Sequence, residues 1–305
     1  MKILYQYQSL DNSCALTCIS MLLSGYGIQI GDYQLIKNSF VPYMIKLNKE
    51  QSQILAAFQI QDKTTFNRIV NKYNLRFSDI ECSDWEDFKK EADQLLKNNH
   101  PFMIGINPEC IFGENKDKAF PTKHTAIIEE RINDSYKILN PVRKESEFEN
   151  KRQIIFREQE FKVIIESIQD KPFRLGYISK PDIIENINYE NIIEDVKQES
   201  LQAIEYTKKV LQNISIPALT YGKYMALISN FIKPLANDLR SSLLTLSEGK
   251  EIWRTLVELL SDFKKVAIEI QQKLKAGLNF KVEIRNLQHI YEEFSDLYKE
   301  LLINL

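Results

Sequence analysis

The chain has 305 residues, of which 44% are hydrophobic and 27% are charged, an ordinary composition for a globular protein. A chain of this length can bury a full core without support from metals or disulfides. Its formal net charge is −2 at pH 7 and it has no basic tail, which excludes bulk electrostatic attraction to nucleic acid or to an acidic membrane surface.

The four cysteines, Cys14, Cys18, Cys82 and Cys110, form no CxxC pair and no zinc-binding spacing. The N-terminus turns polar too early for a signal peptide, and no apolar run is long enough to span a membrane. Glycine-rich phosphate-binding patterns are also missing. We therefore expect a cytoplasmic protein with reduced thiols, no bound cofactor or metal, and no nucleic-acid or membrane partner.

The first predicted element is a helix that follows the turn-forming run at residues 10–13. Apolar residues recur with helical spacing after Cys14, and Gly25 or Gly27 can end the helix. Ser13 is a suitable N-cap, so Cys14 is expected in the first turn.

Between about residues 51 and 99 the signals are helical, namely at residues 51–58, 64–73 and 85–99. The apolar run from Pro101 predicts a buried strand. Two alternating segments around a polar turn predict a hairpin from His124 to Pro141, and Phe173–Ser179 predicts a further strand.

Pro181 marks the predicted domain boundary. Beyond it, four segments have amphipathic helical spacing, namely residues 192–214, 221–246, 251–277 and 282–302. Pro234 interrupts the second of them. We expect an α+β chain in which residues 1–180 form a catalytic domain and residues 181–305 form a helical bundle or clamp.

Cys14 is the candidate nucleophile because a helix N-terminus favours the thiolate, which is the reactive form of cysteine. The alternative is that Cys14 is only a small buried residue, the common fate of a free cysteine. Cys18 lies one helical turn later and is interpreted as core packing.

Only three histidines could serve as a base. His124 begins a strand, from which its side chain can reach a cleft, whereas His100 and His289 are interpreted as surface or cap residues. A hairpin turn centred near Ile132 would place His124 opposite Asn140. The Asn140 carbonyl could then accept Nδ1–H and leave Nε2 for the thiol.

That geometry depends on the register, because a slip of one residue would move Asn140 to the other face of the sheet. Asn140-Pro141 can also be a simple turn starter, and the two roles are compatible. Gln8 completes the set, since acyl transfer needs donors for the oxyanion and a side-chain amide plus the Cys14 N–H can supply two. Gln6 is a nearby alternative to Gln8.

The segment from Gln8 through Cys14 to Gly27 resembles the catalytic segment of bacterial papain-like peptidases that cleave double-glycine leader peptides. That family has a glutamine six positions before the cysteine, and a histidine that opens a strand and is followed by an acidic residue and proline. Here Asn140 stands where that family usually has aspartate, although papain itself uses asparagine. The resemblance implies a papain-like fold, with a nucleophile helix and an antiparallel sheet, over residues 6–142.

The combination of such a domain with a helical C-terminal region is similar to the family of butirosin biosynthesis protein H and to the amide-forming enzyme of closthioamide biosynthesis. This resemblance implies an acyltransferase of natural-product or antibiotic biosynthesis that moves an acyl group from a carrier-protein thioester, through acyl-Cys14, to an amine. The expected partners are an acyl or peptidyl carrier protein and a small amine. Phosphopantetheine would arrive on the carrier, so no cofactor of the chain's own is implied.

Two other functions remain open at this stage. A cysteine peptidase or amidase would use the same triad with water as the acceptor, and a papain-like binding module would have a broken triad. A basic run could contact an acidic carrier protein, although mixed charge of this kind is typical of a solvated face. Its members are Arg143, Lys144, Lys151, Arg152 and Arg157.

Overall fold

A computed structural model describes most of the chain as two compact units. The described residues are 2–8, 14–39, 46–48, 57–59, 63–113, 124–168, 172–181, 189–214, 219–227, 234–240, 243–244 and 251–304. Unit 1 comprises Met1–Ser39 and Lys63–Glu185, and unit 2 comprises Phe40–Asp62 and Asn186–Leu305. The single boundary expected near residue 181 therefore does not account for Phe40–Asp62, which groups with the C-terminal helices.

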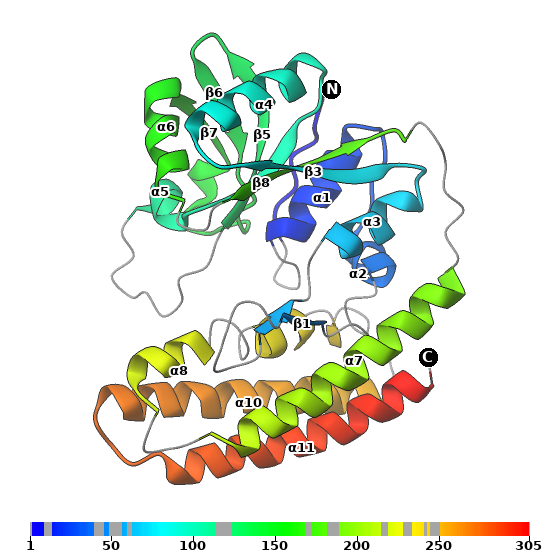
Figure 1. Ribbon diagram of the computed structural model, residues 1–305, viewed down its shortest axis with the longest axis vertical. Helices are drawn as coiled ribbons and strands as arrows, with labels where there is room; N and C mark the ends of the chain where they lie inside the picture. Colours follow the sequence, from blue (N-terminus) through cyan, green and yellow to red (C-terminus); the bar gives the residue numbers. More distant parts are fainter. Residues whose placement is uncertain are drawn as a thin grey trace. The chain divides into compact units, whose positions relative to one another are not determined.

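Unit 1 is built on a six-stranded antiparallel sheet with the order β3-β8-β4-β5-β6-β7 (Figure 1). Its strands are β3 (Arg76–Cys82), β4 (Phe102–Ile106), β5 (His124–Ile132), β6 (Ser135–Leu139), β7 (Gln153–Arg157) and β8 (Phe173–Ser179). The predicted strands at β4 and β8 and the predicted β5–β6 hairpin are confirmed. The edge strands β3 and β7 were not predicted, because edge positions carry polar and charged residues that obscure the strand pattern.

Helices cover both faces of this sheet. They are α1 (Cys14–Ser24), α2 (Asp32–Ser39), α3 (Lys63–Asn71), α4 (Trp85–Lys97), α5 (Pro108–Phe112), the 3₁₀ turn η2 (Glu149–Lys151) and α6 (Glu158–Glu166). One core, which includes α1 and α3, contains Met103, Ile127 and Leu139, and the other, which includes α4 and α6, contains Ile104 and Ile128. Neighbouring residues of a strand point to opposite faces, so β4, which lies between the two cores, has no charged residue.

The predicted helix at residues 14–24 is confirmed, and Leu16–Ser24 are all buried. A helix that is apolar on every side must be enclosed, and α1 packs against the central strands β4, β5 and β8. Gly27 follows with φ of 77°, which supplies the left-handed residue that ends a helix of this kind. This packing carries the first residue of α1 to the start of β5.

The register of the β5–β6 hairpin differs from the predicted one. The turn residues are 133 and 134, Ile132 pairs with Ser135, and a bulge lies between Ile128 and Glu130. Beyond the bulge Ile127 pairs with Leu139, so the same register would place Ala126, two residues from His124, opposite Asn140. An offset of two residues keeps both side chains on one face, and such diagonal neighbours can still touch.

Unit 2 is mainly helical. Its elements are β1 (Lys46–Asn48), β2 (Ala57–Gln59), α7 (Tyr189–Gln212), α8 (Tyr221–Leu227), a π-helical segment η5 (Pro234–Leu239), α10 (Glu251–Lys275) and α11 (Lys281–Ile303). Helices α10 and α11 lie side by side and α7 packs against α11 (Figure 1). Strands β1 and β2 form a small antiparallel pair.

The predicted C-terminal helices are present as α7, α10 and α11, while α8 and η5 occupy part of the predicted helix 221–246. The helix predicted at residues 51–58 is wrong at its end, where Ala57 and Phe58 belong to β2, and residues 51–56 lie outside the described residues. The chain is thus α+β, with an antiparallel sheet and a helical C-terminal region.

Candidate functional site

Cys14 is the first residue of α1, at the tip that meets β5. The backbone N–H of Thr125 donates to Cys14 Sγ at 3.5 Å, and the residue as a whole is half-buried. The helix dipole and this backbone donor both favour a negative charge on sulfur. The predicted N-cap, Ser13, lies outside the described residues.

His124 and Asn140 are in direct contact although they are far apart in the chain. His124 is the first residue of β5 and pairs with Ile106 of β4. Its Nε2 forms a hydrogen bond with Oδ1 of Asn140, the residue that follows β6. The structure therefore brings the predicted base and its predicted partner together, but through Nε2 and not through the predicted Nδ1.

Asn140 is fully buried and held from several sides. Its backbone N–H donates to the Arg152 carbonyl at 2.8 Å, and its side-chain Nδ2 donates to the Lys151 carbonyl at 3.0 Å. Its own carbonyl accepts from the Tyr5 hydroxyl at 2.8 Å. The Tyr5 hydroxyl also accepts from the Val142 N–H at 3.2 Å, so the N-terminal segment clamps the turn after β6.

These contacts define which histidine nitrogen carries the proton. A carbonyl can only accept, so the Lys151 carbonyl must face the Asn140 Nδ2 donor, and Oδ1 must face His124. Oδ1 is an acceptor, which requires a proton on Nε2 of the neutral imidazole. The lone pair of Nδ1 is then the one available to take the proton of Cys14.

The pKa of Cys14 lies below the ordinary value for a thiol. Burial by itself would raise it, but hydrogen bonding with His124, the charge of His124 and contacts from Thr125 together outweigh that effect. Because the thiolate is the nucleophilic form, a lowered pKa increases its population at neutral pH. In contrast, burial raises the pKa of Cys18 well above its ordinary value and that of Cys82 to about 12.

Gln8 lies beside the same loop, and its backbone N–H donates to the Val142 carbonyl at 3.0 Å. Residues 9–13, which connect Gln8 to Cys14, lie outside the described residues. Gln6 has a separate structural contact, since its Oε1 accepts from the Ser20 hydroxyl at 2.7 Å. The oxyanion role of Gln8 stays a prediction, and Gln6 has a role in the core of unit 1.

The other two histidines lie away from this site. The His100 ring lies 5.6 Å from the Tyr177 ring between centroids, tilted by 46°, and His289 is exposed on α11, where it lies 3.2 Å from Glu293. The position of His289 agrees with the sequence interpretation, whereas His100 is half-buried after the end of α4. An unpredicted neighbour of His124 is Phe112, whose ring meets the imidazole at 76° and 5.1 Å. Phe112 restricts the imidazole on the side of α5.

Sequence reasoning missed Tyr5, Phe112 and Thr125. Tyr5 and Phe112 act by tertiary contact across long sequence separations, and nothing in their local pattern indicates those contacts. The contribution of Thr125 is partly a backbone N–H, which any residue type would carry. Its place directly after His124 is the one signal that could have drawn attention to it.

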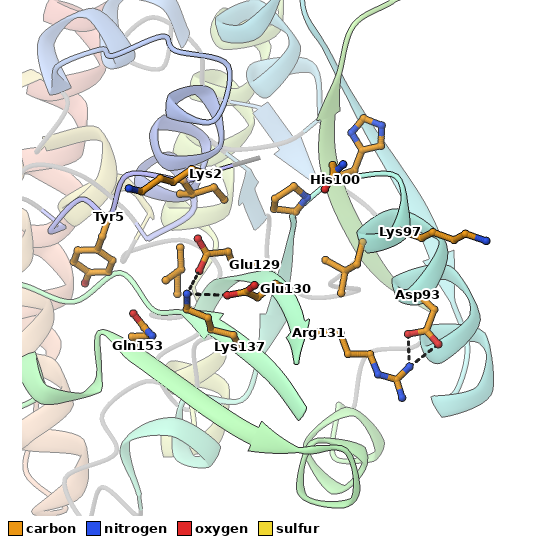
Figure 2. Close-up of a pocket in the computed structure, with 15 residues that line it drawn as sticks. Lys2, Tyr5, Asp93, Lys97, His100, Glu129, Glu130, Arg131, Lys137 and Gln153 are labelled. Atoms are coloured by element: carbon orange, nitrogen blue, oxygen red, sulfur yellow. Dashed lines mark hydrogen bonds and ion pairs between the residues drawn. The ribbon is translucent and has the colours of Figure 1, made fainter. Parts of the chain in front are cut away.

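A cavity of about 800 Å³ occurs in unit 1, and its lining includes none of Cys14, His124 and Asn140. Its wall on β5 is Glu129–Arg131, five to seven residues along the strand from His124, and its lining also includes Tyr5 and Leu139, which adjoin Asn140. Figure 2 shows Lys137 between Glu129 and Glu130, and Arg131 paired with Asp93. These charges already compensate one another, so we assign no chemistry to this cavity.

No group of three or more His, Cys, Asp and Glu side chains is arranged to hold a metal ion in the part of the chain that the structure describes. None of the described helices combines the length and apolar character needed to cross a membrane. No protein-family model matches the chain, and no curated protein matches it either.

Proposed function

We propose that the protein is a cysteine-dependent acyltransferase with a papain-like catalytic domain, in which Cys14, His124 and Asn140 form the triad. The reaction moves an acyl group from a carrier-protein thioester to an amine and forms an amide bond. The observation that carries this proposal is the chain of contacts from Asn140 through the imidazole of His124 to the thiol of Cys14. Such a triad is suited to acyl chemistry because the base and its orienting residue are both in place.

In the first half of the reaction, His124 Nδ1 takes the proton of Cys14, and the thiolate adds to the thioester carbonyl carbon. The tetrahedral intermediate then collapses with cleavage of the bond to the pantetheine sulfur, which leaves with the proton from His124. The Cys14 N–H and the Gln8 amide are the proposed oxyanion donors. The thioester supplies the activation, so the reaction consumes no ATP.

In the second half, an amine adds to the carbonyl of acyl-Cys14 and transfers its proton to His124. The bond between the carbonyl carbon and Cys14 Sγ breaks, the amide leaves, and Cys14 recovers its proton. A reducing, cytoplasmic compartment suits this cycle because a free thiol has to persist.

The carrier protein is expected to contact the basic run that follows Asn140. Within that run Lys151 and Arg152 already have internal partners, the Ile111 carbonyl and the Tyr7 hydroxyl. The exposed cations available to an acidic partner are Arg143, Lys144 and Arg157. Attraction of this kind would be weakened by salt.

The proposal is tested by intact-protein mass spectrometry after mixing with acyl-carrier thioesters, with and without primary amines. We expect a mass adduct that an amine discharges at least about tenfold faster than water does, with release of an amide. Rapid release of the free acid would instead identify a hydrolase with the same triad. Cys14→Ala is the negative control. Full activity in that variant would contradict both the acyltransferase and the hydrolase hypotheses.

A further inference from the structure

The start of β5 carries a pair of sulfur contacts that the proposed mechanism does not use. Thr125 is bracketed by two cysteines of α1 that lie one helical turn apart. Its backbone N–H donates to Cys14 Sγ at 3.5 Å, and its carbonyl accepts from the Cys18 thiol at 3.6 Å. Both backbone groups of one strand residue are therefore engaged by the same helix.

The hairpin register explains why these groups are available to α1. The β5–β6 pairing ends at Ile127 and Leu139, and continuing it would place Pro141 opposite Thr125. Proline has no N–H, so Pro141 could not donate to the Thr125 carbonyl as an ordinary partner in the ladder would. A carbonyl shielded from water without a donor is costly, and at half-buried Thr125 the Cys18 thiol fills that position.

We propose that Thr125 is a further catalytic residue that holds the thiolate of Cys14, and that Cys18 is a positioning residue that fixes Thr125. The inference rests on the proposed function, because it assigns residues to the same nucleophile. Thr125 stabilises the sulfur anion with its backbone N–H, and its side chain also lowers the pKa of Cys14. Cys18, fully buried and held as the neutral thiol by its raised pKa, remains a donor throughout the reaction.

This arrangement gives Cys18 a function that simple core packing would not require. Among the described residues, His124 on β5 and Cys18 on α1 are the ionisable groups that interact with Cys14, and its raised pKa keeps Cys18 protonated near neutral pH.

The test measures the rate at which iodoacetamide alkylates Cys14 as a function of pH, followed by peptide mass spectrometry. The variants are Thr125→Val, which loses the hydroxyl, Thr125→Ser, which keeps it, Cys18→Ala, which loses the donor, and Cys18→Ser, which keeps one. Cys110, a half-buried thiol on α5, is alkylated in the same samples and serves as the internal reference. Circular dichroism verifies that each variant is folded.

We expect the alkylation midpoint of Cys14 to rise by about one pH unit in Cys18→Ala, a roughly tenfold loss of rate below the midpoint. Thr125→Val keeps the backbone N–H that contacts Cys14, so we expect a smaller rise there. Thr125→Ser and Cys18→Ser should stay within about threefold of the unmodified protein, and Cys110 should not change. An unchanged Cys14 midpoint in Cys18→Ala would overturn the inference, and so would an equal shift in Cys18→Ser. Should Cys18→Ala fail to fold, Cys18→Val, which also lacks the donor, is judged by the same criteria.

The outcome is separable from that of the proposed function. Alkylation reports the ionisation of Cys14 and requires no acyl donor. A shifted midpoint in a protein that forms no acyl adduct would overturn the acyltransferase and leave the roles of Thr125 and Cys18 standing. Normal acyl transfer with unshifted midpoints would support the acyltransferase and overturn the roles of Thr125 and Cys18.

Discussion

Replacing Asn140 with aspartate probes the contact that orients the proposed base. The change preserves the shape of the side chain and introduces the aspartate that the proposed resemblance to leader peptidases would place here. The amide, however, has a donor and an acceptor, and both are used, by the Lys151 carbonyl at 3.0 Å and by His124. An ionised carboxylate has no donor, so Asn140→Asp would bring two acceptors together in a buried site.

The expected loss of stability follows from the loss of one buried hydrogen bond, which leaves the Lys151 carbonyl without its donor. Together these cost about 1–3 kcal/mol, so we expect the free energy of unfolding at pH 7 to fall by that amount. Urea unfolding followed by circular dichroism measures it. The matched control is Asn38→Asp, because the Asn38 Oδ1 accepts from the Lys72 ammonium at 2.9 Å and a carboxylate there would meet a cation. A variant Asn140→Asp as stable as the unmodified protein would refute this reasoning.

Two further predictions concern the framework of unit 1. The hydrogen bond from Lys89 and the charges of Arg131 and Lys89 keep the pKa of Glu158 below its usual value. The carboxylate therefore stabilises the fold above about pH 4.3 and loses this effect as the pH falls through the folded-state pKa. Glu158→Gln should lower the free energy of unfolding in urea by about 1 kcal/mol at pH 7 and by close to nothing at pH 2. An equal loss at both pH values would contradict the lowered pKa of Glu158. Gly176→Ala should lower the free energy of unfolding by about 1–3 kcal/mol, because the new methyl would lie 2.4 Å from the Phe77 ring. Gly31→Ala should leave it unchanged, because nothing lies within 4 Å of the position of the new methyl. Equal melting temperatures for the two variants would disprove the steric argument.

The elements with a strong periodic pattern were predicted well from the sequence. These elements are the helix at Cys14–Ser24, the buried strand at Phe102–Ile106, the strand at Phe173–Ser179 and the long C-terminal helices, and they follow from apolar spacing and local stop signals. The edge strands β3 and β7 were missed, because their alternation includes charged residues that face solvent. Phe40–Asp62 groups with unit 2 through tertiary contacts, which no local sequence pattern predicts.

Three of the four predicted site residues come together in the structure, but not with the predicted geometry, and the role of Gln8 stays a prediction. Cys14, His124 and Asn140 meet, but the assumed turn was misplaced and the bulge after Ile128 was invisible in the sequence. The pairing survived because the resulting offset of two residues preserved the face of the sheet. The choice of Nε2 followed from the Lys151 carbonyl, a partner that spacing alone could not have indicated.

Peptide mapping of the acyl-enzyme formed from an acyl-carrier thioester in the absence of amine tests the central claim most directly. We expect the acyl group on the peptide that contains Cys14. We also expect it to form on the order of 100-fold more slowly in His124→Ala, because that variant lacks the base that takes the thiol proton. An adduct on Cys110, or acylation of Cys14 at an unchanged rate in His124→Ala, would contradict the account.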